Sequence, residues 1–472
     1  MTYKPSLPEA AALSAGYKSV PVSREIYSDG TTPVEVMRRL KKVSKRCFIL
    51  ESVEDRTKWG RYTFLGYDPK PEIVSDIKTL RKTLADNASP RVEGLPPFTG
   101  GLVGYFSYEF ITLTEPDLCL DAAKSDGEED FKDFDLMIFD KIIAFDNLRQ
   151  KIILIAAAAT ADLEEGYRKA VSDIEEMREI ITSGSPAKIP TLEILSPFRE
   201  LFRKDEYVDM VKRVKRYIYD GDIFQAVLSN RLDARARGSL FDAYRVLRTT
   251  NPSPYMFYFG SDDIEIAGAS PETLVKLTGG KLYTYPLAGT SPRGATDKED
   301  ALLEAELLSD EKELSEHNML VDLGRNDLGK ISKFGTVEVE NYLHVVKFSH
   351  VMHIASAVKG EIRPDKDALD AISAVLPAGT LSGAPKLRAC EIIAELERSK
   401  RGIYGGALGY IAFNGDMDVC ISIRLAYKRN GKVSVRSGAG IVADSVPERE
   451  YAECADKAKA VINALLESEG EI

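Results

Sequence analysis

The sequence predicts an α+β or layered α/β sandwich of mainly antiparallel strands, and not a doubly wound parallel sheet. Strand-like and helical segments mix along the chain without the strict β–α–β alternation of a parallel sheet. Two strand-like runs, 136–145 and 151–157, meet at Asp146-Asn147, which is typical of a hairpin. Hydrophobic residues make up 44% of the chain, which is enough for a sizeable core.

A linker near 183–197 is expected to divide the chain. This stretch is rich in Ser and Pro and follows a charged helical segment. It separates an N-terminal part, 1–190, from a C-terminal part, 196–472. Besides the hairpin, the N-terminal part is predicted to hold helices at 33–43 and 162–181, a strand at 47–51 and a Gly-rich strand and turn at 100–110. The C-terminal part is predicted to hold helices at 204–220, 298–321 and 447–466, and strands at 224–231, 255–259, 264–267, 408–413, 419–428 and 432–435.

Charge and composition exclude several functional classes. The net charge of −11 over 472 residues disfavours nucleic acid and anionic membrane surfaces as partners. No apolar run reaches the ~20 residues of a transmembrane helix, and the N-terminus has no secretion signal pattern. The five cysteines are scattered and form no C-x-x-C pair, which fits free thiols in a reducing cytoplasm. We therefore expect a cytoplasmic protein.

Two predicted helices each carry a pair of carboxylates on one face. Glu313 and Glu316 are three residues apart, as are Glu450 and Glu453, and Lys457 joins the second face. Taken alone, each pair is more typical of a solvated helix face. If the two helices meet, the four oxygen-bearing side chains suit a hard divalent cation such as Mg²⁺.

Several glycine-rich segments could bind an anion through their backbone N–H groups. They are Tyr285–Thr290, Pro377–Lys386 and Ser437–Gly440, and each alone is also compatible with a plain turn. Thr380 or Ser382 is a candidate cap for a helix that holds Lys386 and Arg388, and such a helix start suits a carboxylate. His353 lies in an apolar run, where a lone histidine is more often a core residue than a catalyst.

Taken together, these segments resemble the chorismate-utilising enzymes, and within them the large subunits of anthranilate synthase. The similarity covers about 202–466, with a weaker match N-terminal to it. It rests on long motifs in one order, GDIFQAVLSNRL (221–232), NPSPYMFY (251–258), PLAGT (286–290), DEKELSEHNMLVDLGRNDLG (310–329), VMH (351–353), AGTLSGAPKLRA (378–389), YGGALGYI (404–411), CISIRL (420–425) and GAGIVADSVPEREYAEC (438–454).

The resemblance implies a sandwich of two mainly antiparallel sheets between outer helices, with partly interleaved N- and C-terminal parts. It implies that Glu316 and Glu453 bind Mg²⁺, with Glu450 and Glu313 close by, and that the metal clamps the ring carboxylate of chorismate. His353, Thr380, Glu313 and Gln225 take catalytic positions. The implied chorismate contacts are Gly289, Thr290, Tyr404, Arg424, Gly438, Ala439, Gly440 and Lys457.

Two positions separate the family's reactions. Aminodeoxychorismate synthases commonly carry a nucleophilic Lys where this chain has Ala288. Isochorismate and salicylate synthases commonly carry a Lys base where it has Gln225, and Gln cannot deprotonate water. Both positions favour direct amination by ammonia. The chain departs from the usual family residues at Tyr285 and Ser291, where Arg is common, and at Arg436-Ser437, where Gln-Ala is usual.

Segments from both parts resemble the two halves of a tryptophan feedback site. These are Glu51-Ser52, at the end of FILES, and Pro254-Tyr255-Met256. We expect a polar group for the ammonium of tryptophan from Glu51 or nearby carbonyls, a hydrogen bond from Ser52, and walls for the indole from Pro254 and Met256.

The implied reaction is the first committed step of tryptophan biosynthesis, in which chorismate and glutamine give anthranilate, pyruvate and glutamate. The chain has no recognisable glutaminase nucleophile motif, so an amidotransferase subunit is expected as partner, in a heterotetramer of two large and two small subunits. The rivals are aminodeoxychorismate synthase, which Ala288 and FILES disfavour, and a non-catalytic chorismate or tryptophan sensor. A sensor would not need four carboxylates together with His353.

Overall fold

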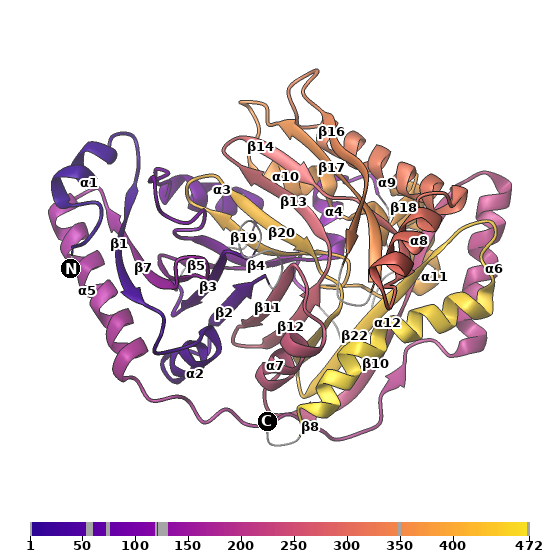
Figure 1. Ribbon diagram of the computed structural model, residues 1–472, viewed down its shortest axis with the longest axis horizontal. Coiled ribbons are helices and arrows are strands. Elements are labelled where there is room, and N and C mark those ends of the chain that lie inside the picture. Colours follow the sequence, from indigo (N-terminus) through magenta and orange to yellow (C-terminus); the bar gives the residue numbers. More distant parts are fainter. Residues whose placement is uncertain are drawn as a thin grey trace.

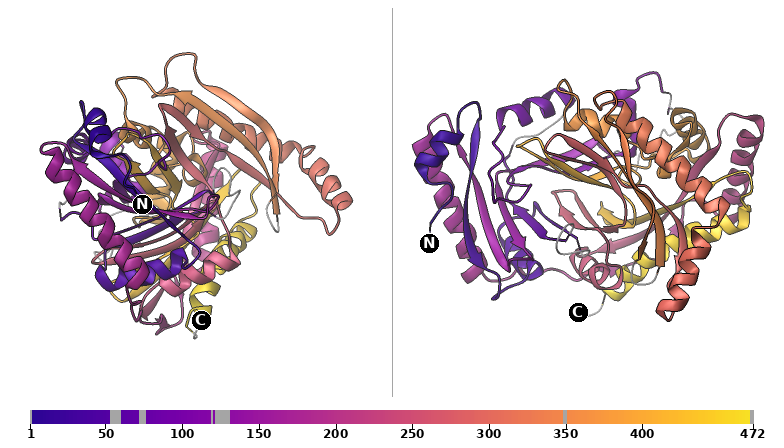
Figure 2. Two further views of the ribbon diagram at one scale, coloured as in Figure 1. Left: turned by 60° about the vertical axis from the view of Figure 1, so that its left-hand side comes forward. Right: turned by 45° about the horizontal axis from the view of Figure 1, so that its top comes forward.

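The computed structural model describes residues 2–52, 60–71, 76–118, 120, 131–347 and 351–469. Two large sheets dominate it, and every pairing between the described strands of these sheets is antiparallel. Figure 1 shows the N-terminal strands at the left of the molecule and the C-terminal helices at the right. The two views of Figure 2 keep this division, with indigo and purple segments on one side and orange segments on the other.

The first sheet has 13 strands among the described residues and joins both ends of the chain. Its central contact pairs a strand near the N-terminus with one from the middle of the chain, Met256 lying opposite Glu51. In spatial order the strands are β1 (Ser19–Tyr27), β7 (Lys151–Ala159), β6 (Lys141–Asp146), β3 (Tyr62–Tyr67), β2 (Cys47–Glu51), β11 (Tyr255–Gly260), β12 (Ile264–Ser270), β21 (Leu425–Arg429), β22 (Lys432–Ile441), β10 (Gln225–Arg237) and β18 (Gly383–Ala384), and β8 (Glu193–Ile194) and β9 (Arg199–Glu200) also pair with β10.

The second sheet has nine strands in the described part and is built in the same mixed way. A strand from the first quarter of the chain lies beside one that begins at residue 407. The order is β15 (Leu287–Pro292), β17 (Val351–Glu361), β14 (Lys281–Thr284), β13 (Thr273–Thr278), β20 (Met417–Ile421), β19 (Ala407–Ala412), β4 (Gly101–Phe106) and β5 (Phe134–Phe139), and β16 (Glu338–Lys347) pairs with β17.

Helices cover the outer faces of both sheets. Those on the first sheet are α1 (Leu7–Leu13), α2 (Pro33–Val43), α5 (Leu163–Ser183), α7 (Phe241–Thr250), α6 (Lys204–Asp220), α11 (Lys386–Glu397) and α12 (Pro447–Glu467). Those packed with the second sheet are α3 (Ile77–Asp86), α8 (Asp297–Leu307), α9 (Glu311–Gly329) and α10 (Ala368–Val375). Short turns complete the set, η1 (Tyr108–Phe110), α4 (Ile111–Thr114) and η3 (Gly379–Leu381).

The core between the sheets confirms the predicted sandwich. Phe48 and Phe257 of the first sheet pack in one cluster with Val103 and Leu408 of the second. Separate apolar clusters lie under the helices on each outer face. The layers therefore run helix, sheet, sheet, helix, because each strand offers alternate side chains to both of its faces.

Local signals set several elements where the sequence predicts them. Helix α2 begins after Thr32, whose side chain accepts a hydrogen bond from the Glu35 N–H, and Pro33 occupies its first turn. Three predicted segments were wrong in one respect, because each is two elements: 136–145 forms β5 and β6, 298–321 forms α8 and the start of α9, and 419–428 forms β20 and β21. No helix in the described ranges is both long and apolar enough to cross a bilayer.

Candidate active site

Gly438, Ala439 and Gly440 of β22 form one wall of the candidate site. They lie beside β10, where Ser229 is opposite Gly438 and Val227 is opposite Gly440. Gly438 has no room for a side chain, since a Cβ there would lie 2.8 Å from the Tyr404 hydroxyl. Lys457 Nζ donates to the Gly438 carbonyl at 3.3 Å. The backbone around Gly438 and Ala439 therefore lies directly beside two polar side chains.

Gln225 closes the same wall at its far end. A Cβ on Gly440 would lie 2.8 Å from Gln225 Nε2, so the amide packs directly on that glycine. Gln225 is 7% exposed and pairs with Ala384 of β18. The position is thus part of the site and carries a neutral hydrogen-bonding group.

Arg424 and the second carboxylate helix face one another. A shallow pocket of about 470 Å³ is lined by Arg424, Glu453 and Lys457 among others. Lys457 forms an ion pair with Glu453 at 2.6 Å. Burial lowers the pKa of Arg424, while Tyr404 and Glu453 partly offset this effect. An anion entering this pocket would meet the Arg424 guanidinium, which burial has separated from solvent water.

The two carboxylate pairs come near enough for their charges to act on one another, which sequence spacing alone could not show. Burial raises the pKa of Glu316 on α9, and the nearby charges of Glu313 and of Glu453 on α12 raise it further. Burial also raises the pKa of Glu450, and Glu453 adds to the effect. Accumulated negative charge of this kind is relieved by a cation.

The four glutamates suit Mg²⁺ by the type of their ligand atoms, but their side chains are not arranged as a metal site. The four side chains offer the oxygen ligands that Mg²⁺ prefers. Within the described ranges, however, no three His, Cys, Asp or Glu side chains are close enough together to hold a metal ion. Lys457 already neutralises Glu453, so metal binding at Glu453 would require that contact to loosen.

His353 on β17 lies against Gly289 on β15. Its Nδ1 donates to the Gly289 carbonyl at 2.9 Å, and His353 pairs with Thr290 in the ladder. This contact assigns the proton to Nδ1 and leaves Nε2 as the basic nitrogen. Burial lowers the pKa of His353, and Arg424 lowers it further, so the imidazole is neutral near pH 7.

Gly289 joins the histidine to the first carboxylate pair. It has φ 66°, a conformation that favours glycine. A Cβ at this position would lie 3.2 Å from Glu313 Oε2. Glu313 and His353 therefore flank the same short stretch of β15.

Glu272 is a site residue that the sequence analysis missed. Thr380 Oγ1 donates to Glu272 Oε1 at 3.0 Å. Burial raises the pKa of Glu272 to about 7, although Thr380 and the charge of Lys457 act in the opposite direction. A signal was present in Ser270-Pro271-Glu272, a carboxylate directly after a buried strand, but a single acid gives no spacing pattern to recognise.

The predicted cap of α11 was wrong. Neither Thr380 nor Ser382 caps α11, which begins after Pro385, because Thr380 bonds Glu272 and Ser382 bonds the Ala378 carbonyl. Lys386 instead donates to Asp327 at 2.9 Å, so this helix start does not offer it to a ligand.

The five residues of the predicted tryptophan site line one pocket of about 110 Å³ between the sheets, namely Glu51, Ser52, Pro254, Tyr255 and Met256. Strand alternation decides how they line it. The Glu51 carboxylate lies on the helix-covered face, where Tyr244 and Arg248 donate to it. Met256 also packs in the cluster on that face. Both residues thus reach the pocket by their backbones, and Tyr62, Phe64 and Tyr410 supply aromatic walls.

Two polar side chains, Ser52 and Tyr255, line this pocket. Ser52 Oγ is buried, with no hydrogen-bond partner among the described residues. The Tyr255 hydroxyl donates to Asp418 at 2.8 Å and lies 2.9 Å from Thr273 Oγ1. Thr273 directly follows Glu272, so the pocket and the Glu272 carboxyl share a strand end.

Comparison with known proteins shows which established family the chain is similar to. Residues 45–463 match the family described as chorismate binding enzyme. The chain is 44% identical to anthranilate synthase component 1 of Acetivibrio thermocellus over 100% of both chains. It is 42% identical to the same component of Aquifex aeolicus, over 98% of this chain and 97% of that one.

The chain belongs to the anthranilate synthase component 1 family of chorismate-binding enzymes. A solved structure agrees with this membership. Anthranilate synthase component I from Streptococcus pneumoniae superposes with a TM-score of 0.76 at 36% identity, covering 92% of this chain and 98% of that one. The menaquinone-specific isochorismate synthase from Escherichia coli superposes with a TM-score of 0.71 at 19% identity, over 97% of this chain and 98% of that one, which shows the shared fold alone.

Proposed function

We propose that this anthranilate synthase component 1 family member converts chorismate and ammonia to anthranilate and pyruvate. The observation that carries the proposal is the grouping of Arg424, Glu453 and Lys457 around one pocket, where Lys457 also donates to the Gly438 carbonyl of β22. The family relationship, which spans the full chain, supports the same reaction.

Binding falls to the cationic and backbone groups. Arg424 pairs with a carboxylate of chorismate, and the backbone of Gly438, Ala439 and Gly440 receives another polar edge of the ligand. Tyr404 and Lys457 fix that backbone from either side. Gly289 and Thr290 complete the site from β15, next to His353.

The chemistry has two proton-linked steps. Ammonia adds at C2 of the ring while the C4 hydroxyl departs as water, and Glu272, which still holds a proton near pH 7, supplies the proton for that departure. A proton then leaves C2 as the enolpyruvyl group is expelled as pyruvate and the ring becomes aromatic. His353 Nε2 is the base that accepts this proton, and Thr380 holds Glu272 in place.

Mg²⁺ is the cofactor that suits the acidic side of the site. Glu316 and Glu453 would hold it, with Glu450 and Glu313 nearby, directly or through water. When bound, the ion neutralises the ring carboxylate of chorismate and the repulsion among the glutamates. Gln225 keeps the wall beside Gly440 neutral, which favours amination over hydration of the ring.

Glutamine serves as nitrogen source through a second protein. The relatives are named as a first component, which supports a separate amidotransferase component that hydrolyses glutamine and passes ammonia to this chain. We further propose that both proteins act in the cytoplasm, as a heterotetramer of two large and two small subunits.

Tryptophan, the end product of the pathway, is the proposed occupant of the pocket between the sheets. Ser52 Oγ offers a buried hydrogen-bonding group, and the aromatic walls accept an indole. The ammonium would bind backbone carbonyls, because the Glu51 carboxylate is already satisfied by Tyr244 and Arg248. The N-terminal part, 1–190, thereby carries a tryptophan-regulatory segment and is interleaved with the chorismate-binding catalytic part, 196–472.

The test uses the purified chain alone with chorismate and Mg²⁺, and follows anthranilate by fluorescence. Turnover is expected with ammonium salts and not with glutamine. Chelation of the metal should abolish it, and re-addition of Mg²⁺ should restore it. Robust turnover with glutamine alone would contradict the assignment of a separate amidotransferase, and no anthranilate with ammonia would contradict the reaction itself.

A further inference from the structure

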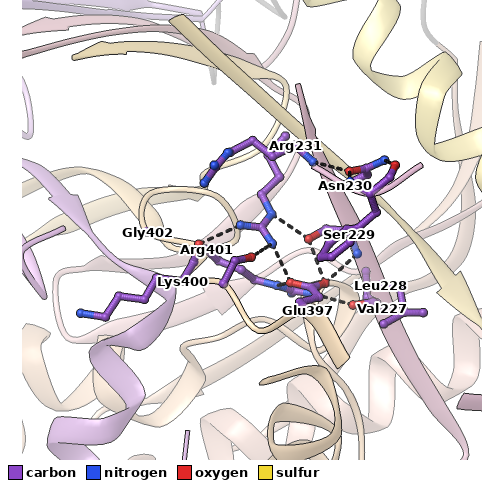
Figure 3. Close-up of polar contacts among 12 residues, drawn as sticks. Val227, Leu228, Ser229, Asn230, Arg231, Glu397, Lys400, Arg401 and Gly402 are labelled. Atoms are coloured by element: carbon purple, nitrogen blue, oxygen red, sulfur yellow. Dashed lines mark hydrogen bonds and ion pairs between the residues drawn. The ribbon is translucent and has the colours of Figure 1, made fainter. Parts of the chain in front are cut away.

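A buried ion cluster lies behind the substrate wall. It consists of Glu397, Arg401, Arg436 and Ser229, which we call the Glu397 cluster. The four residues are between 0% and 4% exposed. They come from four separate elements, α11, the loop after it, and the paired strands β10 and β22. Figure 3 shows Glu397 facing Ser229 and Arg401, with polar contacts converging on its carboxylate.

The Glu397 carboxylate accepts a full set of hydrogen bonds. Oε1 accepts from the Ser229 N–H at 2.7 Å, from Ser229 Oγ at 2.9 Å and from Arg401 Nη2 at 2.6 Å. Oε2 accepts from Arg401 Nε at 2.9 Å and from Arg436 Nη2 at 2.7 Å. Five donors on one buried carboxylate make a rigid centre, because a buried charge tolerates little loss of its partners.

The cluster occupies a gap in the β10 ladder. On the side away from β22, β18 pairs with β10 only at Gln225 and Ala226. The pairing of β9 with β10 begins only at Leu232. In between, the Ser229 N–H meets Glu397, and the Val227 carbonyl accepts from Arg401 Nη2 at 2.6 Å. Charged side chains thus take the place of a neighbouring strand along this stretch.

Arg436 connects this centre to two substrate-facing segments. It lies two residues before Gly438 on β22. Its Nη1 donates to the Lys400 carbonyl at 2.8 Å, and its Nη2 to Ser399 Oγ at 3.1 Å, in the loop that leads to Tyr404. Its guanidinium also lies 6.0 Å from the centre of the Tyr404 ring. A single side chain therefore fixes the distance between the loop of Tyr404 and the strand of Gly438.

We infer that Arg436 is a positioning residue for chorismate, which holds the Tyr404 hydroxyl against the Gly438 backbone so that both meet the substrate together. This inference rests on the proposed chorismate site. Arg401 supports the same wall by donating to the Leu381 carbonyl at 2.6 Å, next to Thr380. Arg436 itself makes its contacts with protein and does not touch the substrate.

The test measures chorismate KM and kcat, together with the thermal midpoint, for Arg436→Met and Arg436→Lys in the full chain with ammonia and Mg²⁺. Methionine is unbranched and apolar and removes all four donated hydrogen bonds, which go to Glu397, to Ser399 Oγ, to the Lys400 carbonyl and, from Nε at 2.8 Å, to Ser229 Oγ. We expect KM to rise about tenfold with kcat within about threefold, because the wall acts on binding. Lysine restores a charge beside Glu397 but cannot reach Ser229, Glu397 and the Lys400 carbonyl together, so the midpoint should recover more than KM does.

Two further variants make the result decisive. Arg61→Met breaks an ion pair with the buried Asp146, 3.0 Å long, in the N-terminal half of the first sheet, and should lower the midpoint without changing KM. If Arg436→Met fails to fold, the milder Arg436→Gln carries the same comparison.

An unchanged KM in Arg436→Met with a lowered midpoint would overturn the inference, as would a KM that recovers in step with the midpoint in Arg436→Lys. Arg424→Ala separates this failure from failure of the site. If Arg424→Ala raises KM and Arg436→Met does not, the inference alone is wrong. If neither raises KM, the proposed chorismate site is wrong as well.

Discussion

Replacing Glu272 by glutamine is expected to remove activity and, above pH 7, to make the protein more stable. The Glu272 carboxyl has its pKa raised from 4.5 to about 7, chiefly by burial. The unfolded chain loses this proton near pH 4.5 and the folded chain near pH 7, so the unfolded state binds fewer protons in that window. Stability therefore falls as the pH rises from 4.5 to 7 and then levels off.

The size of the effect follows from the same two values. The difference between pKa 4.5 and about 7 corresponds to roughly 3 kcal/mol of unfolding free energy, as an upper limit, at pH 8. Glutamine keeps the shape and the acceptor for Thr380 but cannot ionise. The variant should gain that amount relative to the native chain at pH 8 and nothing at pH 4.5, while its turnover falls ~100-fold or more with the loss of a general acid.

The assay compares thermal midpoints at a series of pH values, together with anthranilate production at pH 7. Glu265→Gln is the matched control. Burial raises the pKa of Glu265, but the charge of Lys41 and hydrogen bonds from Tyr258 and Ser239 outweigh it and leave the pKa lowered. That variant should be less stable than the native chain above pH 4.5. A stability difference for Glu272→Gln that does not depend on pH, or near-normal turnover, would refute the reasoning.

Four other substitutions test the rest of the site and the pocket between the sheets. Glu316→Gln and Glu453→Gln should each lower turnover ~100-fold or more at limiting Mg²⁺, because each removes a charge that faces the metal. Circular dichroism should show little change in fold. Near-normal rates in both variants would remove the two residues from the metal site. Arg424→Ala should raise chorismate KM about 10- to 100-fold, the usual cost of one charged hydrogen bond, and an unchanged KM would place the substrate carboxylate elsewhere. Ser52→Phe should fill the pocket between the sheets and raise the tryptophan concentration for half-inhibition more than tenfold, within the ~1–3 kcal/mol range of typical allosteric coupling, with little change in uninhibited turnover. Native and Ser52→Phe inhibition curves that coincide would show that tryptophan does not act through this pocket.

Elements with strong local signals could be predicted from the sequence. The bounds of α2, β2 and α6 agree with the predicted 33–43, 47–51 and 204–220. Their periodic apolar residues and helix-start or turn residues act over short distances, so no partner strand is needed to recognise them. The prediction of a mainly antiparallel sandwich is also confirmed.

Breaks within apolar runs could not be predicted, because they depend on distant strands. The run 136–145 divides at Asp140, after which the chain leaves the second sheet for the first. The run 419–428 divides before Leu425, where Arg424 adopts φ 53°. In both cases the residues favour a strand on either side, and only the pairing partners decide where one ends.

For the site, the sequence likewise identified residue types, but not where their side chains lie in the fold. Motifs identified Glu316, Glu453 and His353, but only the fold shows that Glu316 on α9 lies near enough to Glu453 on α12 for their charges to interact. Strand alternation turned Glu51 and Met256 away from the pocket that their neighbours face. Glu272 had no pattern of its own, since its chemistry comes from burial beside Thr380.

The interleaving of the two sheets also governs how the chain can fold as it leaves the ribosome. Strand β2 must wait for β11, about 200 residues later, and β4 must wait for β19, about 300 residues later. Until then both nascent strands expose open edges and apolar faces. At about 5–20 residues per second this exposure lasts roughly 10 to 60 seconds, long enough for chaperones to bind. Slowing synthesis before residue 255 should therefore increase aggregation of the newly made chain, whereas pauses after residue 441 should have little effect.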